Sequence, residues 1–231
     1  MNKHTIVEKI EDFAPLDLAE NWDCSGWLVK TNKNKVNKVM LALTITDEII
    51  NQANANNCDM IISHHPLFYV PLEYKKIDIY CAHTNLDRTN GGTTDTLINV
   101  LGLSEYKTGI DNSSFIRYVD CEFSVEDFAK LLSKVSPNLR YVNNKNIENI
   151  SKIAFCAGSG SEFIREAQEN GADAFVTGDL KFHTAVDSEI AVYDIGHFES
   201  EILILEVLKK LINGVEVIFS QEKSPFIQKK Y

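Results

Sequence analysis

A short apolar run that ends in two adjacent histidines sets the strongest limit on how this chain can fold. Asp59 to Ser63 reads Asp-Met-Ile-Ile-Ser, and His64-His65-Pro66 follows it directly. A continuously apolar run of this length is typical of a strand that is buried on both faces of a parallel sheet. A second run of this kind, Ile77 to Ala82, ends at His83. The sequence therefore predicts a sheet whose buried strands carry histidines to one edge.

Helical patterns alternate with such strands along most of the chain. Apolar spacing predicts helices at residues 5–13, 47–56, 94–101, 125–135, 162–170 and 200–212, and strands at 36–43, 153–156, 174–177, 191–195 and 215–219. Strands that alternate with helices indicate an α/β fold. Sites in such folds lie beyond the carboxyl ends of the strands. We therefore expect the polar residues after each strand to carry the function.

The two halves of the chain repeat one pattern. The segment from Asn56 to His65 resembles the segment from Asn170 to Asp179, and the next strand of each half ends at a histidine, His83 or His197. This pattern indicates a degenerate duplication. We expect one unit of 231 residues with two similar α/β lobes that face each other across a metal-binding cleft. Lobe 1 would span about residues 1–110 and lobe 2 about residues 111–231, and strands could be exchanged between them.

Composition narrows the class of partner. The formal net charge of −10 disfavours nucleic acid, because phosphate binding needs clustered Lys and Arg. No run of 18 apolar residues predicts a membrane span, and the acidic, amphipathic N-terminus does not resemble a signal peptide. The five cysteines are scattered and show no C-x-x-C spacing, which argues against a disulfide framework. We therefore expect a cytoplasmic protein that contacts neither nucleic acid nor a membrane.

Histidines and carboxylates at these strand ends have the chemistry of a metal site. Adjacent histidines at a strand end can diverge toward different ions, and a carboxylate four residues after His83 can bridge two ions. A histidine and a glutamate four residues apart, at the start of a helix in the second half, would complete the set. The candidate ligands are His64, His65, Asp87, His197 and Glu201. Nitrogen and oxygen ligands of this kind suit two divalent ions, whether Zn, Fe or Mn.

Two ions held this way favour hydrolysis, because metal-bound water is a nucleophile at neutral pH and paired ions can stabilise both attacking and leaving oxygens. His83 could be a ligand, could orient a ligand, or could donate a proton. His183 is a second candidate for proton transfer. The stretch before it, Thr177 to Lys181, is also explained as a tight turn in which Asp179 caps the next helix. A His-His-Pro segment or one glutamate in a first helical turn is common in structural roles as well.

Several blocks of the sequence together resemble the family called GTP cyclohydrolase 1 type 2, or Nif three-like proteins. The resemblance covers nearly the whole chain, with the blocks in the family's order. They are Trp22-Asp23, Ser63-His64-His65-Pro66, His83-Thr84-Asn85-Leu86-Asp87, Thr177-Gly178-Asp179-Leu180-Lys181-Phe182-His183 and Gly196-His197-Phe198-Glu199-Ser200-Glu201.

The resemblance implies a two-lobed α/β fold, a dinuclear divalent-metal centre and a toroidal homohexamer. Its metal ligands would be the five residues proposed above from spacing, and its activity would be hydrolysis of GTP to 7,8-dihydroneopterin triphosphate. Alternatives are a metal-dependent phosphoesterase or amidohydrolase that acts on another small metabolite, and a non-catalytic metal-binding scaffold or interaction protein. Two departures stand out: Thr44 occupies a position where the family often has aspartate, and residues 22–27 read Trp-Asp-Cys-Ser-Gly-Trp.

Overall fold

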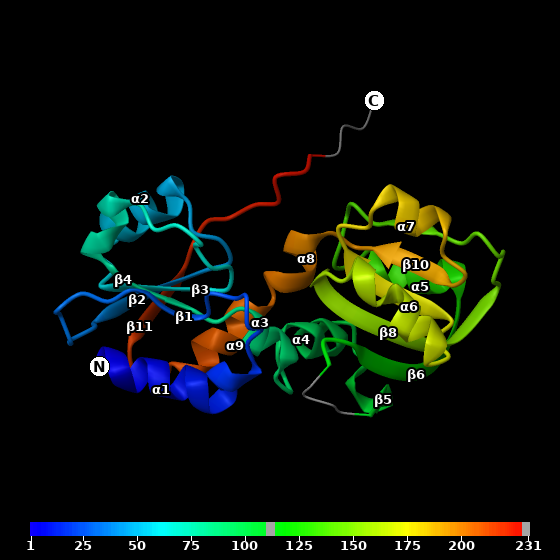
Figure 1. Ribbon diagram of the computed structural model, residues 1–231, viewed down its shortest axis with the longest axis horizontal. Coiled ribbons are helices and arrows are strands. Elements are labelled where there is room, and N and C mark those ends of the chain that lie inside the picture. The colour runs from blue at the N-terminus through cyan, green and yellow to red at the C-terminus, as the bar shows by residue number, and fades with distance from the viewer. Residues whose placement is uncertain (110–113, 228–231) are drawn as a thin grey trace. The chain divides into compact units, whose positions relative to one another are not determined.

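The protein forms two compact units. The computed structural model describes residues 1–109 and 114–227 (Figure 1). Unit 1 comprises Met1–Gly92 and Ile204–Lys223, and unit 2 comprises Thr93–Leu203 and the residues from Ser224 onward. The lobe division predicted at about residue 110 falls on 110–113, which lie outside the described residues. The chain thus leaves unit 1 after Gly92 and returns to it at Ile204.

Unit 1 is built on one five-stranded sheet in the order β1-β4-β3-β2-β11. The four strands from β4 to β11 run parallel, and β1 is antiparallel to β4. The strands are β1 Gly26–Val29, β2 Lys38–Ala42, β3 Met60–Ser63, β4 Asp78–Cys81 and β11 Glu216–Phe219. The helices are α1 Lys3–Phe13, α2 Asp47–Ala55, α3 Thr84–Arg88 and α9 Ile204–Leu211, with 3₁₀ turns at Leu16–Leu18 and Leu72–Lys76.

Both faces of this sheet are buried, as the apolar runs predict. On one face, Met40 and Ile61 belong to a buried cluster with Ile49 of α2. On the other face, the neighbouring residues Leu41 and Ile62 are also fully buried. Successive residues of a strand point to opposite faces, so the runs Val39–Ala42 of β2 and Met60–Ile62 of β3 are continuously apolar.

Unit 2 contains a six-stranded sheet in the order β5-β6-β8-β9-β10-β7. The three central strands β8, β9 and β10 are parallel, and antiparallel strands border them on both sides. The strands are β5 Lys107–Thr108, β6 Arg117–Ser124, β7 Arg140–Val142, β8 Asn149–Ser159, β9 Ala174–Gly178 and β10 Ala191–Asp194. The helices are α4 Thr93–Val100, α5 Val125–Leu132, α6 Ile164–Glu169, α7 Phe182–Val186 and α8 His197–Glu201, with 3₁₀ turns at Ser104–Tyr106 and Ser161–Phe163.

Two buried clusters cover the two faces of the unit 2 sheet. Phe155 packs in one cluster with Phe128 of α5 and Tyr193 of β10. Phe175 packs in the other with Ile164 of α6. The expected α/β class is therefore confirmed, with helices packed against a mostly parallel centre in each unit.

The internal repeat is visible as the same hydrogen-bonding pattern in both units, in which an aspartate accepts two consecutive backbone N–H groups. In unit 1, Oδ2 of Asp59 accepts backbone N–H groups of Asn37 at 2.8 Å and Lys38 at 3.3 Å. In unit 2, Oδ2 of Asp173 accepts those of Ser151 at 2.8 Å and Lys152 at 3.0 Å. Each aspartate immediately precedes a central strand and binds the adjacent strand at or just before the point where their parallel pairing begins. The aligned segments 56–65 and 170–179 thus have the same local structure.

The predicted helix at residues 200–212 differs most from the structure. The helix expected at residues 200–212 is two helices, α8 and α9, with a break between Glu201 and Ile204 that coincides with the boundary between the units. α8 starts earlier than predicted because Gly196 adopts a φ of +84°, which turns the chain directly into the helix at His197. No helix in the described ranges is long and apolar enough to cross a membrane.

Candidate metal site

Three histidines of unit 1 come together beyond the ends of two neighbouring strands. β3 and β4 pair in parallel, with Ser63 opposite Cys81, so the residues that follow them meet at one edge. The ring centroid of His64 lies 5.0 Å from that of His65 and 5.2 Å from that of His83. One ring nitrogen of each histidine lies within 4.8 Å of the others, a spacing at which the three could hold a metal ion.

Asp87 adds a carboxylate to this group. α3 begins directly after His83, and the backbone N–H of Asp87 donates to the His83 carbonyl at 3.0 Å, which places the two residues one helical turn apart. Oδ1 of Asp87 lies 3.4 Å from Nε2 of His64. Unit 1 therefore combines imidazole nitrogens and a carboxylate, the donor set that divalent first-row metals prefer.

Each of the three histidines contacts the protein through Nδ1. Nδ1 of His64 donates to the carbonyl of Ala82 at 2.9 Å, which leaves the lone pair of the neutral ring on Nε2. Nδ1 of His83 lies 2.9 Å from Oδ1 of Asp23, and Nδ1 of His65 lies 2.7 Å from Oγ1 of Thr44. Histidines that ligate metals almost always engage their other nitrogen in this way.

Asp23 is a site residue that spacing arguments did not select. Oδ2 accepts hydrogen bonds from the hydroxyls of Ser25 and Thr84, both at 2.6 Å, while Oδ1 faces His83. Burial would raise the pKa of this carboxyl, but the hydrogen bonds from His83, Ser25 and Thr84 hold the pKa well below its usual range. Asp23 is therefore an ionised partner of His83. Its only sequence signal is the Trp22-Asp23 block of the family resemblance.

The second group lies in unit 2, on the short helix α8. Because His197 and Glu201 are four residues apart on this helix, their side chains share one face, and Nε2 of His197 lies 2.9 Å from Oε2 of Glu201. The start of α8 is fixed by Asp194, whose Oδ1 accepts the N–H of Gly196 at 3.0 Å. Glu201 is almost fully buried, with 4% of its surface exposed.

Asp179 is the outer partner of His197. Its Oδ2 lies 2.7 Å from Nδ1 of His197, so both ring nitrogens face carboxylates. Burial alone would lower the pKa of His197, but Glu201 and Asp179 raise it to about 9. The expectation that Asp179 caps the next helix is wrong, since Lys181 is the N-cap of α7 and, among the described residues, no side chain makes a capping hydrogen bond there. The same carboxylate instead orients a candidate ligand.

Gly158, at the end of β8, leaves room for the Glu201 carboxylate. A Cβ at this position would lie 2.1 Å from Oε1 of Glu201 and 3.6 Å from Nε2 of His197. The φ of Gly158 is +70°, and its N–H donates to Oγ of Ser200 at 2.9 Å. Only glycine fits so close to the carboxylate. The fold therefore reserves space around the His197 and Glu201 donors, as a metal site requires.

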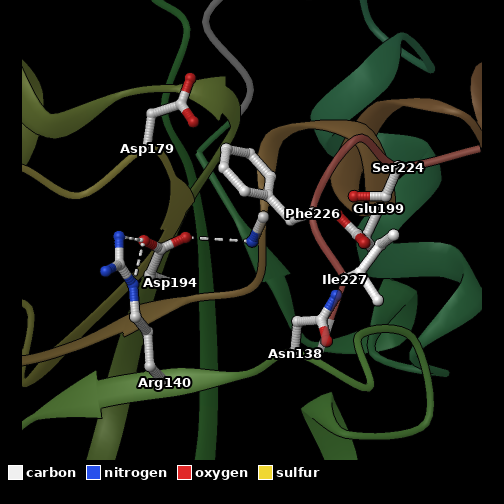
Figure 2. A pocket seen from close by; sticks show the side chains of 9 residues that line it. Asn138, Arg140, Asp179, Asp194, Glu199, Ser224, Phe226 and Ile227 are labelled. Atoms are coloured by element: carbon white, nitrogen blue, oxygen red, sulfur yellow. Dashed lines mark hydrogen bonds and ion pairs between the residues drawn. The ribbon is translucent and has the colours of Figure 1, made fainter. Parts of the chain in front are cut away.

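A pocket of about 250 Å³ adjoins Asp179 within unit 2. Figure 2 shows the carboxylates of Asp179 and Asp194 on one side of this pocket, Glu199 on the other, and the ring of Phe226 between them. Arg140 donates to Oδ2 of Asp194 at 2.6 Å and offsets one of the negative charges. The remaining lining residues are Asn138, Gly196, Ser224 and Ile227. The pocket has the size of a small-molecule fragment and an excess of hydrogen-bond acceptors.

His183 lies in a different part of unit 2. It is exposed on α7 and lines a groove with Arg165 and Gln168 of α6. The structure thus assembles His64, His65, His83 and Asp87 within unit 1, and His197 and Glu201 within unit 2. The proton-transfer role of His183 stays a prediction.

Comparison with known proteins identifies relatives over nearly the full length. The profile of the family Duf34/NIF3 (NGG1p interacting factor 3) matches residues 1–225. A GTP cyclohydrolase 1 type 2 homolog of Clostridium perfringens is 35% identical over 98% of this chain and 99% of that protein. One from Clostridium acetobutylicum is 32% identical over 89% and 87%. The crystal structure of the Staphylococcus aureus hypothetical protein SA1388 aligns at a TM-score of 0.87 with 25% identity, covering 99% of both chains.

Proposed function

This chain belongs to the Duf34/NIF3 family, and we propose from that premise that it is a hydrolase of a small molecule that depends on two divalent metal ions. In this proposal three ligands come from unit 1 and two from unit 2. They are His64, His65, Asp87, His197 and Glu201. The donor set suits Zn, Fe or Mn. We also propose the homohexamer and the cytoplasmic location that the sequence led us to expect.

The observation that carries the proposal is shared by four histidines. His64, His65, His83 and His197 all contact protein oxygens through Nδ1, at distances between 2.7 and 2.9 Å. Histidines that only pack in a core would not all be expected to use the same ring nitrogen for hydrogen bonding. For His64, His65 and His197, each grouped with a carboxylate, this arrangement supports metal ligation through Nε2, and for His83 it leaves Nε2 for proton exchange.

The residues of the chain itself would bind, orient and exchange protons. When bound, divalent ions act as Lewis acids and generate a nucleophile from water at neutral pH. Asp87 and Glu201 supply negative charge, while Asp23 holds the His83 ring with Nε2 directed away from the carboxylate. In this arrangement His83 exchanges a proton with the substrate or with water at Nε2, and Asp23 holds the ring in place through Nδ1.

GTP is the substrate we propose: with one water it gives 7,8-dihydroneopterin triphosphate, and C8 of the purine leaves as formate. Two relatives carry the name GTP cyclohydrolase 1 type 2 homolog. The pocket beside Asp179 supports a guanine base, because the N–H groups of guanine can donate to Glu199 and Asp179 while Phe226 offers an aromatic face. The triphosphate would lie outside this pocket, since the three carboxylates of its lining outnumber the one guanidinium.

Elemental analysis and GTP turnover before and after chelation test the proposal. We expect two ions per chain, loss of turnover on chelation and recovery when the metal is restored. His65→Ala and Glu201→Ala should remove turnover while circular dichroism shows a folded protein. Unchanged turnover in the metal-free protein would rule out the metal-dependent mechanism. Metal-dependent cleavage of a phosphoester or an amide, without GTP turnover, would overturn only the substrate.

A further inference from the structure

We propose that Thr44 and Glu222 are positioning residues for His65: Glu222 fixes the backbone that presents the Thr44 hydroxyl to Nδ1 of His65. All three residues belong to unit 1. The proposal rests on the proposed function only in treating His65 as a metal ligand. It assigns a role to the segment Ser220–Glu222, which directly follows β11.

Two contacts hold His65, one through its ring and one through its backbone. Oγ1 of Thr44 lies 2.7 Å from Nδ1 of His65, and the N–H of His65 donates to the carbonyl of Leu43 at 2.8 Å. The ring and the backbone of His65 are thus both tied to residues 43 and 44. Any shift of these two residues therefore moves His65 with them.

Glu222 fixes residues 43 and 44 with its carboxylate. Oε1 accepts the N–H of Leu43 at 2.7 Å, and Oε2 accepts the N–H of Thr44 at 2.8 Å. These two N–H groups follow the end of β2 at Ala42, where the regular pairing with β11 has stopped. A carboxylate that accepts two consecutive N–H groups forms two charge-assisted hydrogen bonds, which are stronger than neutral ones.

The segment that carries Glu222 is itself anchored within unit 1. The N–H of Ser220 donates to the carbonyl of Leu41 at 2.9 Å, and the Ser220 hydroxyl donates to Glu222. On α2, Oε1 of Gln52 accepts the N–H of Gln221 at 2.8 Å. Glu222 is therefore held between a strand and a helix. A carboxylate held in this way can determine where the Thr44 hydroxyl lies.

Loss of either residue should affect the direction of the His65 ring more than folding. Thr44 is exposed, so its hydroxyl adds little to the stability of the core. Residues that contact the outer nitrogen of a metal ligand typically change metal affinity by about 10–100-fold when replaced. Thr44→Val keeps the shape of the side chain and removes the hydroxyl. Thr44→Ser keeps the hydroxyl and serves as the conservative rescue.

The test measures Zn²⁺ affinity by competition with a chromophoric chelator, and the ring ¹⁵N shifts of His65 in the metal-free protein. We expect Thr44→Val to weaken Zn²⁺ binding by about 10–100-fold, and Thr44→Ser to bind nearly as the wild type does. Glu222→Gln should weaken Zn²⁺ binding by about tenfold. The amide oxygen of the new side chain can accept one of the two backbone N–H groups, but its NH₂ group is itself a donor and cannot accept the other. Glu216→Gln, on β11 and paired with Lys38, is the matched control and should change nothing.

Two outcomes would overturn the inference. One is Zn²⁺ binding within about twofold of wild type in both Thr44→Val and Glu222→Gln, well below the effect expected for an outer partner of a ligand. The other is an unchanged set of ring ¹⁵N shifts for His65 in Thr44→Val. The ¹⁵N measurement needs no metal. If the wild type binds no Zn²⁺, the proposed metal centre is contradicted, but the ¹⁵N shifts still test whether Thr44 positions His65.

Discussion

The Asp23 carboxylate lies 2.9 Å from Nδ1 of His83, although 60 residues separate the two in sequence. The side chain of Asp23 is fully buried, and that of His83 is 18% exposed. One ring nitrogen of His83 is therefore committed to a fixed anion, and Nε2 is left for other chemistry. A carboxylate that contacts one nitrogen of a histidine in this way sets the tautomer of the ring and fixes its orientation.

Replacing Asp23 by asparagine should lower kcat by about 10²-fold, the lower end of what positioned proton transfer contributes. Zn²⁺ binding should persist, because Asp23 is not among the proposed ligands. Steady-state kinetics and Zn²⁺ titration measure the two effects separately. Asp59→Asn is the control, since Asp59 also accepts backbone N–H groups in unit 1 but has no histidine partner in the contacts described. Equal kinetics in the two variants would exclude a role for Asp23 in turnover.

The Asp23 carboxylate should also make folding sensitive to acid. Its pKa is lowered in the folded protein, so its stabilising effect is complete above about pH 4, the unfolded pKa, and is lost as the pH falls. At pH 7 we expect Asp23→Asn to lower the free energy of unfolding by about 2 kcal/mol, because hydrogen bonds to a buried charge are lost. Urea unfolding at pH 7 and pH 3 measures this. A difference that does not shrink at pH 3 would contradict the assignment.

Gly158→Ala tests whether space beside Glu201 is required. An alanine at positive φ costs about 1–2 kcal/mol anywhere, so a control with the same strain is needed. Gly102 is that control, because its φ is +76° and no described atom lies within 4 Å of where a Cβ would be. At Gly158 the Cβ would lie 2.1 Å from Oε1 of Glu201. We expect Gly158→Ala to lower the free energy of unfolding more than Gly102→Ala, and to lose Zn²⁺ binding. Equal effects of the two variants would show that the space has no function.

Glu199→Gln tests the pocket as a binding site for a guanine base. A carboxylate that accepts from ring N–H groups contributes about 1.5–3 kcal/mol, so its neutralisation should raise KM for GTP by about tenfold or more with little change in kcat. Glu189→Gln is a suitable control, because Glu189 is exposed and paired with Lys145. A fall in kcat at unchanged KM would assign Glu199 a different role.

The grouping of His64, His65 and His83 was accessible from sequence because it depends on two local signals. Apolar runs identify buried parallel strands, and the residues after neighbouring parallel strands meet at one edge. The same reasoning places His197 and Glu201 one helical turn apart. These signals need no knowledge of how distant loops fold.

Asp23, Thr44 and Glu222 were not accessible in this way. Each lies outside the regular strands and helices and acts through a contact to a residue at least 21 positions away. Neither period 2 nor period 3.6 marks such residues, and their side chains are common in loops for other reasons. The break between α8 and α9 escaped prediction for a related reason. The apolar pattern continues through residues 202 and 203, where the structure has a break that coincides with the boundary between the units.

His197 should make metal affinity depend on pH. Burial opposes its charged form, but Glu201 and Asp179 raise the pKa of His197 from 6.5 to about 9, so the proton stabilises the fold below about pH 6.5 and this effect is lost as the pH rises through 9. A metal ion must displace this proton. We expect Zn²⁺ affinity to rise about tenfold per pH unit between pH 7 and pH 9, with release of about one proton from His197. Calorimetry in phosphate and in Tris measures that proton. Asp179→Asn should move the end of the rise to lower pH, and Zn²⁺ binding at pH 7.5 without proton release would contradict ligation by His197.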